Sequence, residues 1–223
     1  MLVIENVHKT YGSPPAPVTN ALKQINLTIS KGEFTVLAGP SGSGKTTLLN
    51  IMGLLDQPDE GEVYLKGKKT SELLKNDAAD LRLHNIGFVF QSYNLIEVLT
   101  AVENVEYVML LQGVDARTRR HKAKEILRAV GLEECIKRKP SEMSGGQQQR
   151  VAVARAIVAE PSLVLADEPT ANLDSKTGYQ LIELMKHFNE SKGVTFCISS
   201  HDPMVIDMAK RLIRVKDGIA DEI

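Results

Sequence analysis

The fold of this chain is decided by the stretch Gly39-Pro40-Ser41-Gly42-Ser43-Gly44-Lys45-Thr46. It follows a short, apolar, β-prone segment at residues 34–38 and precedes residues 46–52, where apolar side chains recur at helical spacing. This order predicts a strand, a glycine loop and a helix. Residues 162–166 and 194–198 are continuous apolar runs, as expected of strands that are buried on both faces of a parallel sheet. Together these segments predict an open α/β core.

Further elements are expected on either side of this core. Residues 2–4 and 25–29 are expected to form strands, separated by a surface loop at residues 13–17. Helical patterns replace strand signals between residues 94 and 159, and they are clearest at residues 101–111 and 117–130.

The glycine loop has the spacing G-x-x-x-x-G-K-[ST], which between a strand and a helix is typical of a phosphate-binding loop. Its glycines let backbone N–H groups turn inward around phosphate oxygens, and the following helix adds its positive N-terminus. Lys45 is expected to reach the β- and γ-phosphates, and Thr46 to be a ligand of Mg²⁺. A purely structural turn would need fewer glycines and would not explain Lys45. The sequence therefore predicts a nucleotide site at residues 39–47, with Thr47 as its last member.

Two carboxylates, Asp167 and Glu168, follow the apolar run at residues 162–166. They fall at the carboxyl edge of the predicted sheet, where open α/β folds bind their ligands. Asp167 is expected to hold Mg²⁺ through water. Glu168 is the candidate general base that orients and deprotonates the water attacking the γ-phosphate. Taken alone, such a pair of acids fits a helix N-terminus equally well.

A second anion site is predicted at Ser144, Gly145, Gly146 and Gln147, which precede a strongly helical stretch at residues 151–158. Small residues at a helix N-terminus leave backbone amides accessible to an anion. The two predicted phosphate sites are about a hundred residues apart in the chain. Their coexistence is explained if the second site contacts the γ-phosphate of a nucleotide that another copy of the chain holds.

Composition excludes several other classes of protein. The 223 residues are enough for one large α/β domain, and 27 Lys and Arg against 28 Asp and Glu leave no excess charge for nucleic acid or anionic lipid. Cys135 and Cys197 lie far apart, which argues against a disulfide framework and favours a reducing compartment. The N-terminus lacks the pattern of a signal peptide, and no apolar run approaches the roughly 18 residues of a spanning helix. A membrane role is therefore expected to come through a partner.

With these motifs in this order, the chain resembles the ATP-binding cassette (ABC) ATPases over nearly its whole length. The resemblance implies an α/β fold with a P-loop NTPase core of the RecA type, an antiparallel β subdomain and an inserted α-helical subdomain. Residues 1–223 would form one domain. Residues 1–93 and 160–223 would make the nucleotide-binding core with its β subdomain, and residues 94–159 the helical subdomain that carries the signature motif.

The resemblance also implies roles for residues whose own signal is weak. Tyr11 would stack on adenine, Gln91 would sense Mg²⁺ and the membrane partner, and residues 144–147 would form the signature. Asp174 would lie in a D-loop that crosses the dimer interface, and His201 would contact the γ-phosphate and help position the attacking water. Without the resemblance, Tyr11 would be interpreted as a surface tyrosine and His201 as a structural histidine.

Two departures from the family pattern leave the phosphate chemistry intact. The signature begins with Met143 where leucine is usual, and the D-loop carries Ala171-Asn172. Neither change removes a group that handles phosphate.

The implied function is ATP hydrolysis, with Mg²⁺ as cofactor, that powers a separate permease through head-to-tail dimerisation of two copies. Residues 50–56 and 165–174 are similar to the lipoprotein-release and macrolide-export subgroup, whose permeases have four membrane helices and a large extracytoplasmic domain. The chain would then lie in the cytoplasm, on the inner face of the cell membrane, without a nucleic-acid partner. Residues 92–105 are expected to form much of the permease docking groove, although their apolar side chains would equally fit a core.

Three alternatives stay open at this point. The chain would otherwise be a soluble ABC ATPase outside transport, a module that holds ATP without hydrolysing it, or the ATPase of a signalling complex with a related permease. A single cassette without coiled-coil or zinc insertions argues against the first, and the presence of Glu168 and His201 against the second. The cargo is expected to be bound by the permease, so this sequence does not identify it.

Overall fold

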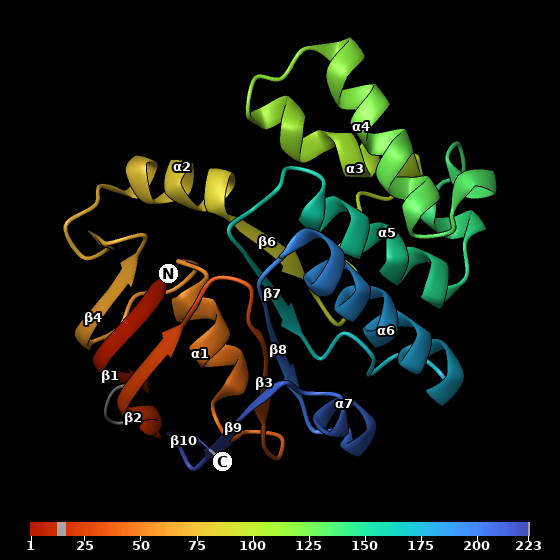
Figure 1. The fold of residues 1–223 in the computed structure, drawn as a ribbon. Coiled ribbons are helices and arrows are strands. Elements are labelled where there is room, and N and C mark those ends of the chain that lie inside the picture. Colours follow the sequence, from red (N-terminus) through yellow and green to blue (C-terminus); the bar gives the residue numbers. More distant parts are fainter. Residues whose placement is uncertain (13–16, 223) are drawn as a thin grey trace.

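The computed structural model describes residues 1–12 and 17–222. The surface loop predicted at residues 13–17 therefore falls almost entirely outside the described residues. Two sheets organise the described part of the chain (Figure 1). The larger has six strands in the order β10-β9-β3-β8-β7-β6, and all neighbours pair in parallel except β10 with β9. Its strands are β3 (Phe34–Ala38), β6 (Ile86–Val89), β7 (Leu163–Asp167), β8 (Phe196–Ser200), β9 (Arg211–Lys216) and β10 (Ile219–Glu222). The predicted open, mostly parallel sheet is confirmed.

The second sheet is the antiparallel one that the family resemblance implied. Its order is β2-β1-β4-β5, with β1 (Leu2–Tyr11), β2 (Thr19–Ile29), β4 (Glu60–Leu65) and β5 (Lys68–Lys69). The sequence predicted only residues 2–4 and 25–29 as strand. Both strands extend beyond these residues. Their full length was missed because the pairing shifts register between Ile4 and Val7 and again before Lys9, and such irregularities break the alternation by which a strand is predicted.

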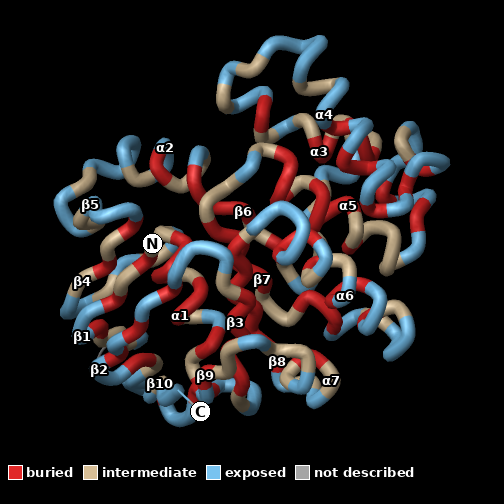
Figure 2. The backbone as a smooth tube through the Cα atoms, in the orientation of Figure 1, coloured by how far each residue is buried: buried red, intermediate tan, exposed pale blue. Residues whose placement is uncertain are grey.

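Helix α1 (Lys45–Met52) lies between the two sheets. Its buried residues pack in one apolar cluster with side chains from both, including Ile4 of β1 and Leu165 of β7. Figure 2 shows that the buried residues follow the central strands and the helix faces turned toward them. The start of α1, and with it the phosphate loop, is thus fixed by packing on both sides.

Most of the remaining helices lie on the other side of the large sheet (Figure 1). These are α3 (Ala101–Leu111), α4 (Ala116–Ala129), α5 (Gly145–Ile157), α6 (Ser175–Lys192) and α7 (Pro203–Asp207), with short 3₁₀ turns at Glu133–Cys135 and Pro140–Glu142. Helix α2 (Lys75–Asn85) is the exception, because its buried Leu81 belongs to the apolar cluster around α1. Helices α3, α4 and α5 pack on one another within residues 94–159, the segment for which a separate helical subdomain stays a prediction. Helix α5 also packs directly on β6, where a Cβ on Gly87 would lie 2.2 Å from the Ala156 carbonyl oxygen. Tight contact with the sheet therefore fixes the signature helix.

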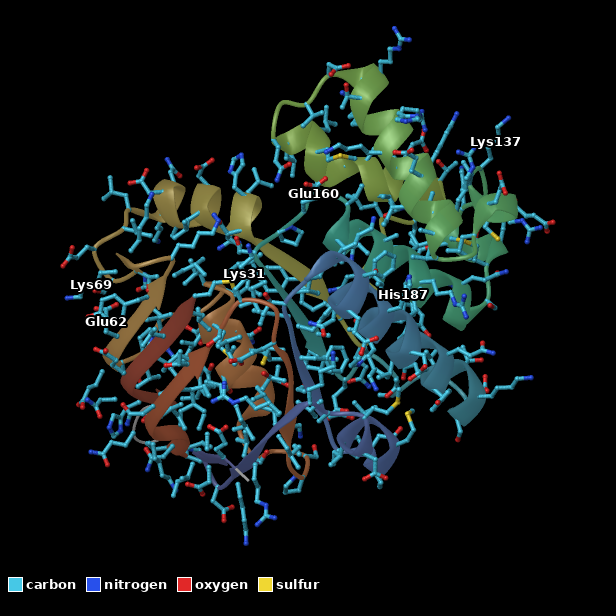
Figure 3. All side chains as sticks on the ribbon, viewed as in Figure 1. Lys31, Glu62, Lys69, Lys137, Glu160 and His187 are labelled. Carbon is cyan, nitrogen blue, oxygen red and sulfur yellow. The ribbon has the colours of Figure 1, made fainter. Side chains whose placement is uncertain are left out.

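Charged side chains of both signs point outward over the surface (Figure 3). Lys69 and Glu62, for example, pair at 3.3 Å on the antiparallel sheet. Among the described residues, no helix is both long enough and apolar enough to cross a membrane.

Candidate nucleotide-binding and catalytic site

The phosphate loop joins the carboxyl end of β3 to the first turn of α1, and two of its glycines are required by close backbone contacts. A Cβ on Gly39 would lie 2.0 Å from the Val215 carbonyl oxygen, and one on Gly44 would lie 2.5 Å from that of Ala21. Gly44 also has a φ of 107°, a conformation that only glycine adopts without strain. Gly44 precedes α1 without a side-chain cap, so the first amides of the helix face the loop. The loop thus has the backbone of an anion site.

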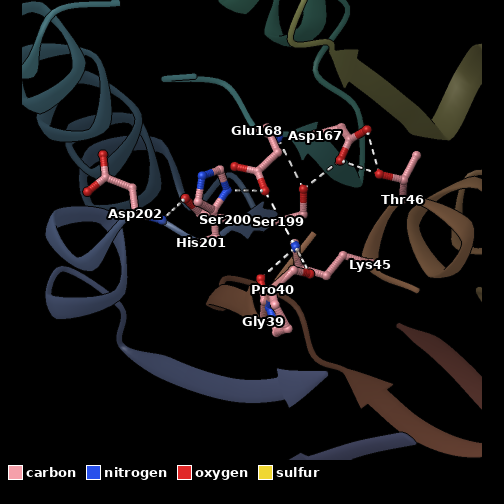
Figure 4. A network of polar contacts seen from close by, with 10 residues as sticks. All are labelled: Gly39, Pro40, Lys45, Thr46, Asp167, Glu168, Ser199, Ser200, His201 and Asp202. Atoms are coloured by element: carbon pink, nitrogen blue, oxygen red, sulfur yellow. Dashed lines mark hydrogen bonds and ion pairs between the residues drawn. The ribbon is translucent and has the colours of Figure 1, made fainter. Parts of the chain in front are cut away.

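Lys45 lies beneath this loop with only 5% of its side chain exposed. Its ammonium donates hydrogen bonds to the carbonyl oxygens of Gly39 (2.7 Å) and Pro40 (3.0 Å). It also lies 3.5 Å from a carboxylate oxygen of Glu168 (Figure 4). One buried positive charge therefore stands between the phosphate loop and the predicted base.

The Thr46 hydroxyl and the Asp167 carboxylate form the second arm of the site. The hydroxyl lies 3.1 Å from each carboxylate oxygen. Ser199, at the buried carboxyl end of β8, donates a hydrogen bond of 2.6 Å to Asp167 Oδ1 and so fixes the carboxylate (Figure 4). Ser199 was not among the site residues predicted from the sequence. In the sequence, Ser199 is only a polar residue near the end of an apolar strand. Its role can be inferred only when β8 is known to pair with β7, which carries the two acids.

Glu168 and His201 lie together on the other side of Lys45. His201 Nδ1 is 2.9 Å from Glu168 Oε1, and the histidine is 61% exposed whereas Glu168 is 14% exposed. Glu168 has a φ of 44°, which is unusual for a residue with a side chain. Its N–H donates to both the carbonyl and the hydroxyl oxygen of Ser199, at 3.1 Å each. These bonds hold the turn that aims the carboxylate at Lys45 and His201.

The donors at this site fit Mg²⁺. Hydroxyl and carboxylate oxygens are the ligands that this ion prefers, and it commonly takes only one or two from protein while phosphates and water supply the rest. Among the described residues, no cluster of three or more His, Cys, Asp or Glu forms a self-sufficient metal site. Thr46 and Asp167 together match a nucleotide-bound Mg²⁺.

Tyr11, the predicted adenine platform, ends β1 with its ring 42% exposed. Its hydroxyl donates a 2.6 Å hydrogen bond to Asp56, and the Lys9 ammonium lies 5.3 Å from the ring centre. Burial and the bond to Asp56 raise the pKa of Tyr11, while the Thr47 hydroxyl lowers it. Tyr11 is therefore held next to the phosphate-loop helix as a neutral, oriented ring, and stacking on adenine stays a prediction.

The signature residues form an ordinary helix start. Ser144 caps α5 and accepts a bond from the Gln147 amide (3.3 Å), while the Gln147 side chain accepts one from the Ser144 amide (2.9 Å). Gly145 and Gly146 face Tyr93 and Thr177 so closely that an added Cβ would lie 2.7 Å and 2.5 Å from their side-chain atoms. Figure 1 shows this end of α5 far from the start of α1. One copy therefore does not bring the two predicted phosphate sites together.

Two further predicted residues also lie outside the cluster around Lys45. Asp174 caps α6, and hydrogen bonds from the Thr177 hydroxyl and amide lower its pKa. Gln91 is exposed just after β6, and its carbonyl accepts a 2.9 Å bond from Asn172 of the D-loop. Their predicted contacts with nucleotide remain predictions.

A separate cavity of about 990 Å³ lies between α4, the end of α6 and the turn at Ser30 and Lys31. None of the site residues predicted from the sequence lines it. The candidate active site lies elsewhere, along the carboxyl edge of the large sheet.

The fold and the site define a P-loop ATPase. Residues 22–171 match the family model described as ABC transporter. The chain is 48% identical to the uncharacterized ABC transporter ATP-binding protein MJ1508 of Methanocaldococcus jannaschii, over 100% of this chain and 99% of the relative. It is 44% identical to the lipoprotein-releasing system ATP-binding protein LolD 1 of Rhodopseudomonas palustris, over 98% and 97%.

A solved structure gives the same result. The dimeric, post-hydrolysis structure of the ATP-binding cassette MJ0796, bound to ADP and Pi, has a TM-score of 0.91 and 44% identity over 100% of this chain and 98% of that one. The chain belongs to the ABC transporter family. It is an ATP-hydrolysing, ATP-binding subunit of that family with the fold that the sequence predicted.

Proposed function

We propose that this chain powers export through a separate membrane permease by binding ATP and Mg²⁺ between two head-to-tail copies. The observation that carries the proposal is the convergence of three groups: Lys45 under the phosphate loop, the Glu168–His201 pair, and the Thr46–Asp167 oxygens. Phosphoryl transfer needs charge neutralisation, a metal site and a base in this arrangement.

Each group has a chemical task. The Lys45 ammonium binds the β- and γ-phosphates together with the amides at the start of α1. Thr46 and Asp167 would hold Mg²⁺, and the ion would supply charge neutralisation at the phosphates. Gln91 reports the state of this metal to the permease.

Glu168 is the proposed base. It accepts the proton of the attacking water, whose oxygen bonds to the γ-phosphorus as the bond to ADP breaks. His201, 2.9 Å from the carboxylate, fixes its orientation and contacts the γ-phosphate. The low exposure of Glu168 excludes bulk water, while the open side next to His201 admits the nucleotide.

The second copy completes the site. Residues 144–147 of one copy would cap the γ-phosphate held by Lys45 of the other, and Asp174 would cross the interface between them. The exposure of Thr46 and His201 in one copy supports a site that a second surface covers. Hydrolysis would remove the shared γ-phosphate contacts and loosen the dimer, which is the movement passed to the permease.

Exposed apolar side chains support a permease docking surface, which we define as the exposed residues of 96–111. It shares only residues 96–105 with the segment 92–105 that the sequence predicts for docking. Among the described residues, the large apolar side chains that are exposed concentrate there: Ile96, Val98, Tyr107, Leu110 and Leu111. An apolar surface of this kind on a helix and the loop before it fits a partner helix. The relative named for a lipoprotein-releasing system supports a transporter as the assembly in which the chain works. We propose that the partner is a permease with four membrane helices and a large extracytoplasmic domain, as the family resemblance implies. We place the chain on the cytoplasmic face of the membrane, without a nucleic-acid partner.

Replacing the base tests the mechanism. Glu168→Gln keeps the size of the side chain but cannot accept the proton, so turnover should fall at least about 100-fold while ATP–Mg²⁺ binding persists. The variant should accumulate as an ATP-bound dimer, measured by light scattering after gel filtration beside the phosphate-release rate. The matched control is Glu160→Gln, an exposed carboxylate whose one ion pair among the described residues is with Lys122. A Glu168→Gln variant that hydrolyses ATP at the wild-type rate would rule out Glu168 as the base.

A further inference from the structure

Gln149 is a fully buried side chain of the signature helix α5 that the mechanism above does not use. Its amide nitrogen donates hydrogen bonds to two backbone carbonyls, those of Pro169 (2.8 Å) and Phe90 (3.3 Å). The two carbonyls belong to different strand ends, β7 and β6, which are neighbours in the large sheet. One amide group therefore joins three elements.

The chemistry of the contacts fixes the orientation of this amide. Both partners are acceptors, so the NH₂ group faces them and the oxygen points away. That oxygen is buried and has no hydrogen-bond partner among the described residues. A buried amide left half satisfied is a poor choice for stability alone, since an apolar side chain of the same shape would avoid the cost. The position therefore calls for a reason beyond packing.

The two carbonyls lie directly beside residues of the active site. Phe90 precedes Gln91, the predicted metal sensor, and Pro169 follows Glu168, the proposed base. Displacing Gln149 would thus move the backbone next to Gln91 and next to Glu168, although Gln149 hydrogen-bonds to neither of their side chains.

Arg155, one and a half turns further along α5, holds the other end of the Gln91 loop. Its guanidinium donates to the carbonyls of Tyr93 (2.9 Å) and Asn94 (2.5 Å), and burial lowers the pKa of Arg155. Tyr93 and Asn94 both have positive φ angles, 61° and 49°, a backbone conformation that needs such support. The loop between Phe90 and Asn94 is thus attached to α5 at both ends.

We infer that Gln149 is a positioning residue that ties movement of the signature helix to the Gln91 loop and to the Glu168 backbone. Residues 144–147 form the start of the same helix, two to five residues before Gln149, so contact with ATP there shifts the Gln149 amide that holds both loops. Through these hydrogen bonds, Gln149 makes hydrolysis depend on correct docking of the second copy. The inference rests on the proposed role of Glu168.

The test is Gln149→Met, which keeps the length and most of the volume of the side chain but removes both donors. We expect kcat to fall about ten-fold, because both backbone carbonyls lose their donor and the two loops are held less well, while KM for ATP stays within about two-fold. Hydrogen exchange should become faster in peptides that contain residues 90–94 and 168–171, and stay unchanged in those from β9 and β10.

The matched control is Asn189→Leu. Asn189 is also a buried amide that donates to carbonyls, those of Gly32 and Val194, but it lies at the opposite end of the sheet. Its loss should lower the melting temperature and leave kcat unchanged. A Gln149→Met variant with wild-type kcat, or one whose kcat falls only as much as that of Asn189→Leu, overturns the inference. Faster hydrogen exchange at residues 168–171 reports loss of the Gln149 contacts, whatever the identity of the base. The assignment of Glu168 as the base is tested separately by Glu168→Gln.

Discussion

At the scale of single residues, the site depends on groups that orient the reacting side chains as well as on those side chains themselves. Ser199 is the clearest example, because its hydroxyl donates to Asp167 and accepts from the amide of Glu168. It thus connects the metal arm of the site to the base. The geometry of both carboxylates depends on one buried hydroxyl on a neighbouring strand.

Ser199→Ala should weaken Mg²⁺ use more than it weakens the fold. Removing the hydroxyl leaves Asp167 free to rotate, so the Mg²⁺ concentration for half-maximal ATPase rate should rise several-fold, at a stability cost of about 1 to 2 kcal/mol. Mg²⁺ titrations of the ATPase rate and urea unfolding measure the two effects. Ser200→Ala is the control, since Ser200 is equally buried but its hydroxyl bonds, within the described part of the chain, to the Asp202 amide alone. Superimposable Mg²⁺ curves for Ser199→Ala and wild type would contradict this role.

The residues that the sequence could identify are those whose type and spacing carry the chemistry. The phosphate loop and the two acids fall into this class, and Lys45 and Glu168 do lie together, 3.5 Å apart. Ser199 and Gln149 could not be found this way, because a polar residue in a buried strand or helix has meaning only once its partners are known. Those partners lie 32 and 20 residues away in the chain and meet only through the sheet.

At the scale of elements, segments with one uninterrupted pattern were predicted best. Strand β3 and helix α3 have the predicted bounds, 34–38 and 101–111. Strand β6 was missed because it is four residues long and contains Gly87, which the close approach of α5 requires. The strand predicted at 194–198 begins two residues later than predicted, at Phe196. Thr195 instead accepts a hydrogen bond from the loop before β3, and Val194 accepts one from α6. Packing between elements thus accounts for these errors.

The permease docking surface spans the loop before α3 and the helix itself, so a change there should separate coupling from catalysis. Ile96→Glu places a charge on an apolar side chain that is 37% exposed, away from the phosphate loop. ATP affinity and the basal rate of the isolated chain should stay within about two-fold, while permease-stimulated hydrolysis in proteoliposomes falls at least about ten-fold. Ile219→Glu, at a comparably exposed position on β10, serves as the control. Lost ATP affinity in Ile96→Glu would contradict the assignment.

At the scale of the whole molecule, the two predicted phosphate sites are separated because each is fixed to a different packing surface. The phosphate loop is held by α1 between the two sheets, whereas the signature is held by α5 on the far side of β6. No rotation within such packed layers brings the start of α5 to the start of α1. A composite site therefore requires a second molecule. The distance between the two predicted phosphate sites thus predicts that two copies of the chain form each complete site.

Complementation between two inactive variants tests that prediction. Lys45→Ala destroys the phosphate loop of its own copy, and Ser144→Arg blocks the signature of its own copy, so each variant alone should be inactive in both of its sites. In a mixed dimer, the intact phosphate loop of the Ser144→Arg copy meets the intact signature of the Lys45→Ala copy. With random pairing, half of the dimers are mixed and one of their two sites works, so an equal mixture should regain about a quarter of the wild-type ATPase rate. A site completed within one copy predicts no recovery at any ratio, so a mixture as inactive as its parts would refute the head-to-tail arrangement.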